Sequence, residues 1–168
     1  MIEGESFVII DLLENQADFI TDVSSMVYKE FVVNTGSKMT FDDVFTYFSN
    51  THSKQFPITL VAIEKTERIG TVSIFENDLK EREIYKPWLA SLYTTFEHRG
   101  KGVGQRLINE TLKVVKELGY KEVYLRTENA SNYYQDRGWS FVETILDNKG
   151  EKIDVFKFIL HNNAALQN

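Results

Sequence analysis

The spacing of hydrophobic residues along the chain predicts most of its secondary structure. Residues 7–13 are largely apolar and predict an opening strand, whereas residues 15–31 place apolar side chains at helical spacing. A second helix is expected to start at Thr40, because Thr40 and Asp43 occupy the two positions of a capping box. The amino-terminal part is therefore predicted to be one strand followed by two helices.

The centre of the chain predicts three strands and a polar connector. A short polar turn between two apolar runs is typical of a β-hairpin. A proline just before an apolar run marks a place where a strand can begin. The expected elements are a strand over 57–64, its antiparallel partner over 69–75, a connector over 77–85 and a strand over 88–94.

The last third predicts two further helices and a closing hairpin. Apolar residues repeat at helical spacing over 103–118, and Gly119 follows as a C-cap. The remaining expected elements are a strand over 122–126, a short helix over 129–137 closed by Gly138, and strands over 141–146 and 153–160 joined by a turn at 147–150.

Composition narrows the class of protein. The chain has 168 residues, of which 42% are hydrophobic and 13% aromatic, enough for a packed core. We expect a single domain over residues 1–168, with residues 161–168 as a frayed tail. The net charge of −6 argues against a broad basic face, so no nucleic-acid partner is expected.

Absent residue types exclude several chemistries. The chain has no cysteine, which excludes a disulfide framework, a thiolate zinc site and a covalent cysteine intermediate. The three histidines are widely scattered, so no metal is expected. The first residues lack the basic start of a signal peptide, and no apolar run is as long as a membrane span. A cytoplasmic protein without membrane attachment is therefore expected.

The stretch from His98 to Leu107 is the strongest candidate for chemistry. It places three glycines and three cationic side chains between a predicted strand and a predicted helix. The first turn of a helix has free N–H groups and a partial positive charge, and glycines let an anion approach them. A strand-to-helix turn that only needs positive φ angles is the alternative. Three glycines exceed what such a turn requires.

Spacing excludes two common phosphate loops. A Walker A loop requires glycine at position 95, which holds Thr95, and serine or threonine at position 102, which holds Gly102. The third glycine of a Rossmann fingerprint would fall at Gln105 or Leu107, depending on which glycine pair starts it. Neither loop is present.

Two motifs instead resemble the GNAT superfamily of N-acetyltransferases. Arg99-x-x-Gly102-x-Gly104 is similar to the loop that binds the acetyl-CoA pyrophosphate, and the stretch from Asn129 to Trp139 is similar to the second cofactor motif. The resemblance covers about 88–139. It implies an α+β fold with α/β/α layers: a mixed, mostly antiparallel sheet of six to seven strands, about four helices on both faces, and a splay between the fourth and fifth strands.

The resemblance also implies which residues bind acetyl-CoA. Backbone groups of the fourth strand would pair with the pantetheine arm as an added strand does. The glycine loop would hold the pyrophosphate, and asparagines of the second motif would contact the cofactor, although an N-cap role explains Asn129 as well. The implied cofactor-binding residues are Leu92, Tyr93, Thr94, Arg99, Gly100, Lys101, Gly102, Val103, Gly104, Gln105, Asn129, Asn132 and Tyr134.

Catalytic roles are less evenly specified. Tyr134 stands at the tyrosine position of the family motif, which implies a general acid; a tyrosine with an unperturbed pKa of about 10 is protonated at neutral pH. A packed aromatic residue is the alternative. Glu76 or Asp78 is the expected general base, with Glu97 also a candidate, although solvated loop carboxylates or a water chain would explain the sequence equally well.

The expected function is transfer of an acetyl group from acetyl-CoA to a primary amine within a ternary complex. The alternatives are a catalytically inactive acyl-CoA-binding or sensing module of the same fold and an unrelated anion-binding α/β domain. The acceptor, a small-molecule amine or a peptide or protein amine, is left open by the sequence. So are the length of the acyl group and the oligomeric state, for which an edge-strand homodimer is one option.

Overall fold

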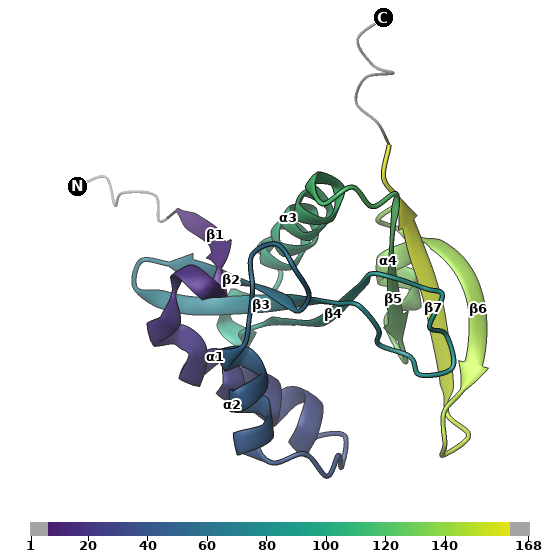
Figure 1. Ribbon diagram of the computed structural model, residues 1–168, viewed down its shortest axis with the longest axis horizontal. Coiled ribbons are helices and arrows are strands. Elements are labelled where there is room, and N and C mark those ends of the chain that lie inside the picture. The colour runs from purple at the N-terminus through teal and green to yellow at the C-terminus, as the bar shows by residue number, and fades with distance from the viewer. Residues whose placement is uncertain (1–6, 162–168) are drawn as a thin grey trace, which may run out of the picture. The chain divides into compact units, whose positions relative to one another are not determined.

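The computed structural model describes residues 7–161 and contains one mixed β-sheet with four α-helices in this part of the chain (Figure 1). Its seven strands follow the order β1-β2-β3-β4-β5-β7-β6. The strands are β1 (Val8–Leu12), β2 (Ile58–Glu64), β3 (Glu67–Phe75), β4 (Trp88–Thr94), β5 (Glu122–Thr127), β6 (Ser140–Leu146) and β7 (Lys152–Ile159). The helices are α1 (Ile20–Val27), α2 (Phe41–Ser49), α3 (Val103–Glu117) and α4 (Ser131–Gln135).

The expected fold class is confirmed. The pairs β1–β2, β2–β3, β5–β7 and β6–β7 are antiparallel. Strands β4 and β5 are parallel, with Trp88 opposite Tyr124, and this parallel pair is consistent with the expected splay between the fourth and fifth strands. The chain groups into two compact units, Met1–Ile74 with Ser91–Thr111, and Phe75–Ala90 with Leu112–Asn168.

The first unit has helices on both sides of its strands. Helices α1 and α2 pack on β2 through a buried apolar cluster that includes Val61 and Ile63. Side chains alternate between the two faces of a strand, so Ala62 points away from α1 and α2, toward the opposite face of the sheet. Gly70 lies opposite Ala62, and a Cβ atom added there would lie 3.1 Å from Leu107 of α3. The start of α3 therefore covers the second face.

The predicted first helix over 15–31 is wrong in its boundaries. Two 3₁₀ turns (Leu13–Asn15 and Ala17–Phe19) precede α1, and a π-helix (Tyr28–Val33) follows it. The late start has a local cause: the Asp11 carboxylate accepts hydrogen bonds from the side chains of Asn15 (3.0 Å) and Gln16 (3.1 Å). Such side-chain bonds compete with regular helix bonds and hold the segment as turns.

The predicted start of α2 is confirmed. The Asp43 N–H donates to Thr40 Oγ1 over 3.1 Å, and the Thr40 N–H donates to Asp43 Oδ2 over 2.9 Å. The end of α3 is also confirmed, because Gly119 has a φ of +93° and its N–H donates to the Lys116 carbonyl over 3.0 Å. Both helix ends depend on contacts within a few residues, which explains why their sequence signals were reliable.

The second unit is an antiparallel sheet of β5, β7 and β6 with the connector between β3 and β4 packed on it. Trp88, Tyr124 and Val155 are buried together in its core. Glu143 of β6 fastens the connector, because its carboxylate accepts a hydrogen bond from Arg82 Nη2 at 2.6 Å and another from the Tyr85 hydroxyl. The connector is thus polar in sequence but fixed to the sheet by paired side chains.

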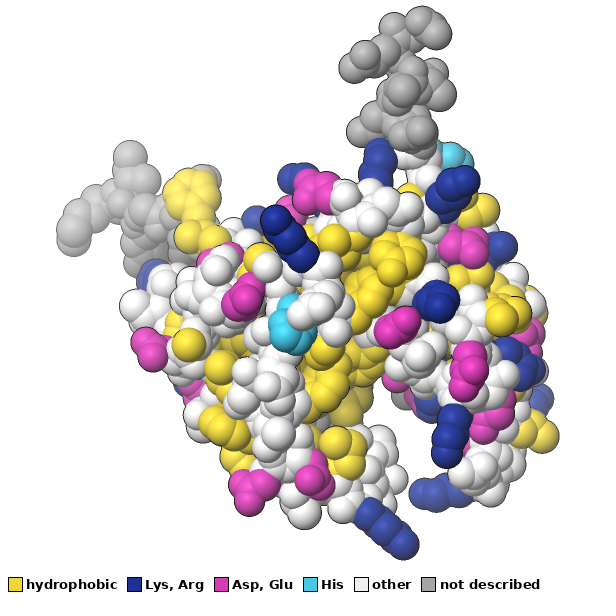
Figure 2. Space-filling model, in the orientation of Figure 1, with side chains coloured by type: hydrophobic (Ala, Val, Ile, Leu, Met, Phe, Trp, Pro, Cys, Tyr) yellow, Lys and Arg dark blue, Asp and Glu magenta, His cyan; other side chains and the backbone are white. Residues whose placement is uncertain are grey.

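The surface charge and the residue clusters of the protein relate to its expected partners and location. On the face shown in Figure 2, lysine and arginine side chains are mixed with acidic ones. Within residues 7–161, no helix is both long enough and apolar enough to cross a bilayer, and no three metal-binding side chains form a cluster. The frayed tail lies outside the described residues except for its first member. The cytoplasmic location, the homodimer and the single domain stay predictions.

Candidate active site

The glycine loop begins α3 in the conformation that the sequence motif demands. Gly100 has a φ of +75° and Gly102 a φ of +83°, a left-handed backbone region that other residues adopt at a cost. A Cβ atom added at either position would meet nothing within 4 Å. The two glycines are therefore required by backbone conformation, and the space above them is open.

The start of α3 places backbone N–H groups beside this loop. The first regular helix bond runs from the Arg106 N–H to the Gly102 carbonyl over 3.1 Å. The N–H groups of Val103, Gly104 and Gln105 come before it, so helix geometry leaves them without an intrahelical acceptor. Donors of this kind at the positive end of a 15-residue helix attract an anion.

Arg99 is held against the end of β4. Its Nε donates to the Thr94 carbonyl over 2.9 Å, and its guanidinium lies 5.5 Å from the Tyr93 ring centroid and 5.8 Å from that of Phe96. These contacts leave the side chain exposed at the loop. The charge of Arg99 is thus placed by the strand from which the loop departs.

Gln105 carries an unmatched acceptor in the first turn of α3. Its Nε2 donates to Asn109 Oδ1 over 2.7 Å, while its Oε1 is buried and has no hydrogen-bond donor among the described residues. A buried carbonyl without a donor is costly, so such an atom is satisfied when a ligand or water supplies an N–H or O–H. An amide-containing ligand fits this requirement.

Strand β4 changes character at Ser91, a feature that the sequence did not signal. Ser91 has a φ of +54°, in the left-handed region, within an element that is otherwise extended. Residues before it are buried, whereas Leu92, Tyr93 and Thr94 after it are only partly buried. The three residues expected to pair with pantetheine are therefore the three that follow the irregularity.

Gly70 brings the β3 backbone close to this part of β4. A Cβ atom there would lie 2.9 Å from the Tyr93 carbonyl oxygen, closer than real Cβ contacts. The Thr95 N–H also donates to the Ile69 carbonyl over 2.9 Å. Glycine at position 70 is thus needed for close packing of two backbones. This role of Gly70 was not predicted from the sequence.

The second motif forms α4 and the turn before it, a helix shorter than the predicted 129–137. A pocket of about 440 Å³ is lined by Asn129, Ala130, Ser131, Asn132 and Tyr133. The two asparagines expected to contact the cofactor are therefore neighbours at one pocket, and both are exposed.

Tyr134 is partly buried among aromatic rings. Its ring meets Tyr133 edge-on at 5.2 Å and Trp139 edge-on at 6.0 Å between centroids. Burial raises the pKa of Tyr134 to about 12, with a further rise from Tyr133 and an opposing effect of Arg137. The phenol is thus protonated throughout the neutral range, as a proton donor must be.

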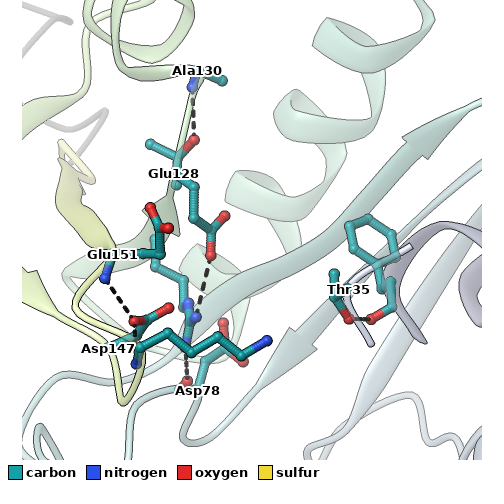
Figure 3. A network of polar contacts seen from close by, with 10 residues as sticks. Thr35, Asp78, Glu128, Ala130, Asp147 and Glu151 are labelled. Atoms are coloured by element: carbon teal, nitrogen blue, oxygen red, sulfur yellow. Dashed lines mark hydrogen bonds and ion pairs between the residues drawn. The ribbon is translucent and has the colours of Figure 1, made fainter. Parts of the chain in front are cut away.

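The two expected bases differ in their surroundings. Glu76 is exposed directly after β3, whereas Asp78 is partly buried. Burial raises the pKa of Asp78 to about 6, although Arg126 opposes the rise. Arg126 donates to the Asp78 backbone carbonyl and to Glu128 Oε1, each over 3.3 Å. Figure 3 marks these two contacts at Asp78 and at Glu128.

The fold and the two motifs together define an acyltransferase. A family model described as the acetyltransferase (GNAT) family matches residues 23–139, and the chain belongs to this family. The match extends well beyond the two motifs: it begins within α1 and includes α2 and the connector.

Comparisons with known proteins agree with this assignment. N-alpha-acetyltransferase 30 of Schizosaccharomyces pombe is 25% identical over 150 residues, which cover 86% of this chain and 93% of the relative. An aminoglycoside 6'-N-acetyltransferase solved with coenzyme A has a TM-score of 0.73 at 14% identity, covering 92% of this chain and 98% of that one. A Salmonella typhimurium protein solved with acetyl-CoA has a TM-score of 0.67 at 16% identity, covering 94% and 96%. The two structural likenesses establish the fold.

Proposed function

We propose that this chain is an N-acetyltransferase that moves an acetyl group from acetyl-CoA to a primary amine within a ternary complex. The observation that carries the proposal is Tyr134, a tyrosine at the position of the family's general acid whose partly buried phenol stays protonated at neutral pH. An inactive binding module has no need of such a group.

The residues of the glycine loop fit acetyl-CoA as the donor. Its pyrophosphate matches the free N–H groups at the start of α3 and the cation of Arg99, and Lys101 adds a second exposed cation. The amide groups of its pantetheine arm match the backbone of Leu92 to Thr94 and the unmatched Gln105 Oε1. Asn129 and Asn132 add polar contacts at their pocket.

The chemistry divides between a base and an acid. Acetyl-CoA supplies a thioester whose carbonyl carbon is attacked by the amine nitrogen. We assign Asp78 as the base, because a carboxylate with a pKa of about 6 is ionised at neutral pH and close enough in pKa to accept a proton from the amine. As the carbon–sulfur bond breaks, Tyr134 donates its proton to the departing thiolate.

The acceptor is assigned only as a primary amine. The names of two similar proteins point to amine acceptors of different size, an α-amino group in one and an aminoglycoside in the other. We expect turnover with one of these classes, in a protein located in the cytoplasm. Acetyl and longer acyl groups are to be compared directly, because the sequence leaves the length of the acyl group open.

A thiol-release assay tests the proposal. Purified protein is incubated with acetyl-CoA and a panel of peptide amino termini, polyamines and aminoglycosides, and free CoA thiol is recorded. We expect release that requires both the donor and an amine. Acetyl-CoA that raises the melting temperature without any turnover across the panel would instead identify a binding module. Failure of acetyl-CoA to change the melting temperature would contradict both readings.

A further inference from the structure

A row of three polar side chains crosses the sheet of the second unit. Asp154 of β7 lies opposite Thr127 of β5 on one side and opposite Thr144 of β6 on the other. Residues directly opposite each other in paired strands point to the same face. The three side chains therefore form one line across β5, β7 and β6.

This row holds the first turn of α4. The Ala130 N–H donates to Thr127 Oγ1 over 2.9 Å, a contact visible at Ala130 in Figure 3. The Ser131 hydroxyl donates to Asp154 Oδ2 over 2.6 Å, and the Thr144 hydroxyl donates to Asp154 Oδ1 over 2.7 Å. Each oxygen of the Asp154 carboxylate thus receives one hydroxyl, and one of these belongs to α4.

Helix α4 needs such support because it is short. It has 5 residues, and its N-cap, Ala130, makes no side-chain cap bond. Isolated helices of this length are unstable, and alanine is a poor N-cap. The hydrogen bonds of Asp154 lower the pKa of its carboxyl, first through Ser131 and then through Thr144, so it stays ionised and a strong acceptor at neutral pH.

Tyr134 is one helical turn away from the anchored residues. Its N–H donates to the Ala130 carbonyl over 3.3 Å, and its carbonyl accepts from the Trp139 N–H over 3.1 Å. Displacement of the first turn therefore displaces the Tyr134 backbone. A catalytic group moved by about 1 Å can lose about 100-fold in rate.

We infer that Asp154 is a positioning residue for acetyl transfer: its bonds to Ser131 and Thr144 fix the first turn of α4 and so orient the hydroxyl of Tyr134. The inference rests on the proposed function, in which Tyr134 is the acid. Asp154 acts through α4 and takes no part in proton transfer itself.

A double-mutant cycle tests this role. Asp154→Ala is expected to lower kcat about 10- to 100-fold at saturating substrates, because α4 loses its anchor. In the Tyr134→Phe background the same substitution is expected to change kcat less than about twofold, because the group being oriented is gone. A purely structural residue would lower kcat by the same factor in both backgrounds, and that result would overturn the inference.

Conservative variants separate geometry from charge. Asp154→Asn keeps the shape, and its amide can still bond both hydroxyls, so most of the lost kcat should return. Ser131→Ala removes only the hydrogen bond between α4 and Asp154, and it should lower kcat by about as much as Asp154→Ala does. A wild-type kcat in a folded Ser131→Ala protein would contradict the role even if Asp154→Ala failed to fold.

Asp11 provides a matched control for Asp154. Asp11→Ala removes another strand carboxylate that accepts bonds from the residues after it, in the first unit, and kcat should be unchanged. If Tyr134→Phe has the wild-type rate, the proposed acid itself is wrong. If it is slow while Asp154→Ala is not, only the positioning role is wrong.

Discussion

Two helices of this protein follow parallel strands, yet their starts are built in different ways. Helix α3 follows β4 through a loop whose shape comes from two left-handed glycines, Gly100 and Gly102. Helix α4 follows β5 through a turn held by side chains, of which Asp154 lies 23 residues from its partner Ser131. One start is thus encoded by the backbone preferences of adjacent residues and the other by contacts between strands.

The difference follows from helix length and from the task of each helix. Helix α3 has 15 residues and sustains its own hydrogen bonds, so its start needs only the right backbone geometry. Helix α4 has 5 residues and is proposed to carry the acid Tyr134, whose hydroxyl must be oriented closely. The anion site at α3 consists of backbone N–H groups, so it depends on the backbone conformation of the loop. The acid on α4 depends instead on the side-chain contacts that hold this short helix in place.

The largest expected effect concerns Tyr134, the proposed acid on α4. Tyr134→Phe removes the phenol proton and should lower kcat about 10²- to 10⁴-fold, the usual range for a general acid. Tyr124→Phe is the matched control, because Tyr124 is a buried tyrosine whose hydroxyl donates to Glu122 over 2.6 Å and has no proposed role in transfer. Stopped-flow or steady-state thiol release compares them. Equal rates for the two variants would contradict the assignment of Tyr134 as the general acid.

The second largest effect is expected at Asp78, the proposed base, which lies outside both helices. Asp78→Asn should lower kcat/KM about 100-fold. In the wild type, kcat/KM should fall about tenfold per pH unit below about pH 6, the pKa of Asp78, and this acid limb should vanish in the variant. Retention of the limb in Asp78→Asn would assign it to another group.

The same variant has a predicted effect on stability. The pKa of Asp78 in the folded protein, about 6, lies above its ordinary value of 3.8, so the folded state binds this proton more tightly than the unfolded chain. Stability from this group is therefore present below pH 3.8 and is lost as the pH rises through about 6. Asp78→Asn should raise the melting temperature at neutral pH and change it little at the acid end. A lower melting temperature at neutral pH would contradict the burial of this carboxyl.

An intermediate effect tests the start of α3. Gly102→Ala places a side chain at a φ of +83°, which costs about 1–2 kcal/mol, and should raise the KM for acetyl-CoA about tenfold as the loop shifts. Gly119→Ala at the other end of α3 has a φ of +93° and the same open surroundings. It should lower the melting temperature similarly and leave this KM unchanged. Parallel changes in KM would show that the helix as a whole, and not its start, sets donor binding.

The smallest expected effect tests the anchoring of α4. Thr127→Val keeps the shape but removes the acceptor for the Ala130 N–H, which should cost about 1 kcal/mol and lower kcat about fivefold. Thr59→Val in the first unit removes a comparable buried bond, to Ser73 at 2.8 Å, and should affect stability alone. Circular dichroism melts and thiol release measure both. A wild-type kcat in Thr127→Val would leave Asp154 as the more important anchor.

Local signals in the sequence were sufficient wherever the structure depends on neighbouring residues. The capping box of Thr40 and Asp43 and the C-cap at Gly119 were predicted because each acts within one turn of helix. The motif at Arg99 to Gly104 was recognised for a similar reason, since Gly100 and Gly102 within it adopt left-handed φ angles that other residues adopt only at a cost. These features, with the second motif, determined the family and the donor that we propose.

Tertiary structure decided what depends on register and burial. The hydrogen bonds of Asp11 delayed the start of the predicted first helix, and Ser91 adopts a left-handed φ that its residue type does not predict. Glu76 and Asp78 are alike in sequence, yet only Asp78 is partly buried and has a raised pKa. Asp154 meets Ser131 only because β7 pairs with β5 in one register. Desolvation and strand pairing arise from residues far apart in the chain, so no local pattern could have shown them.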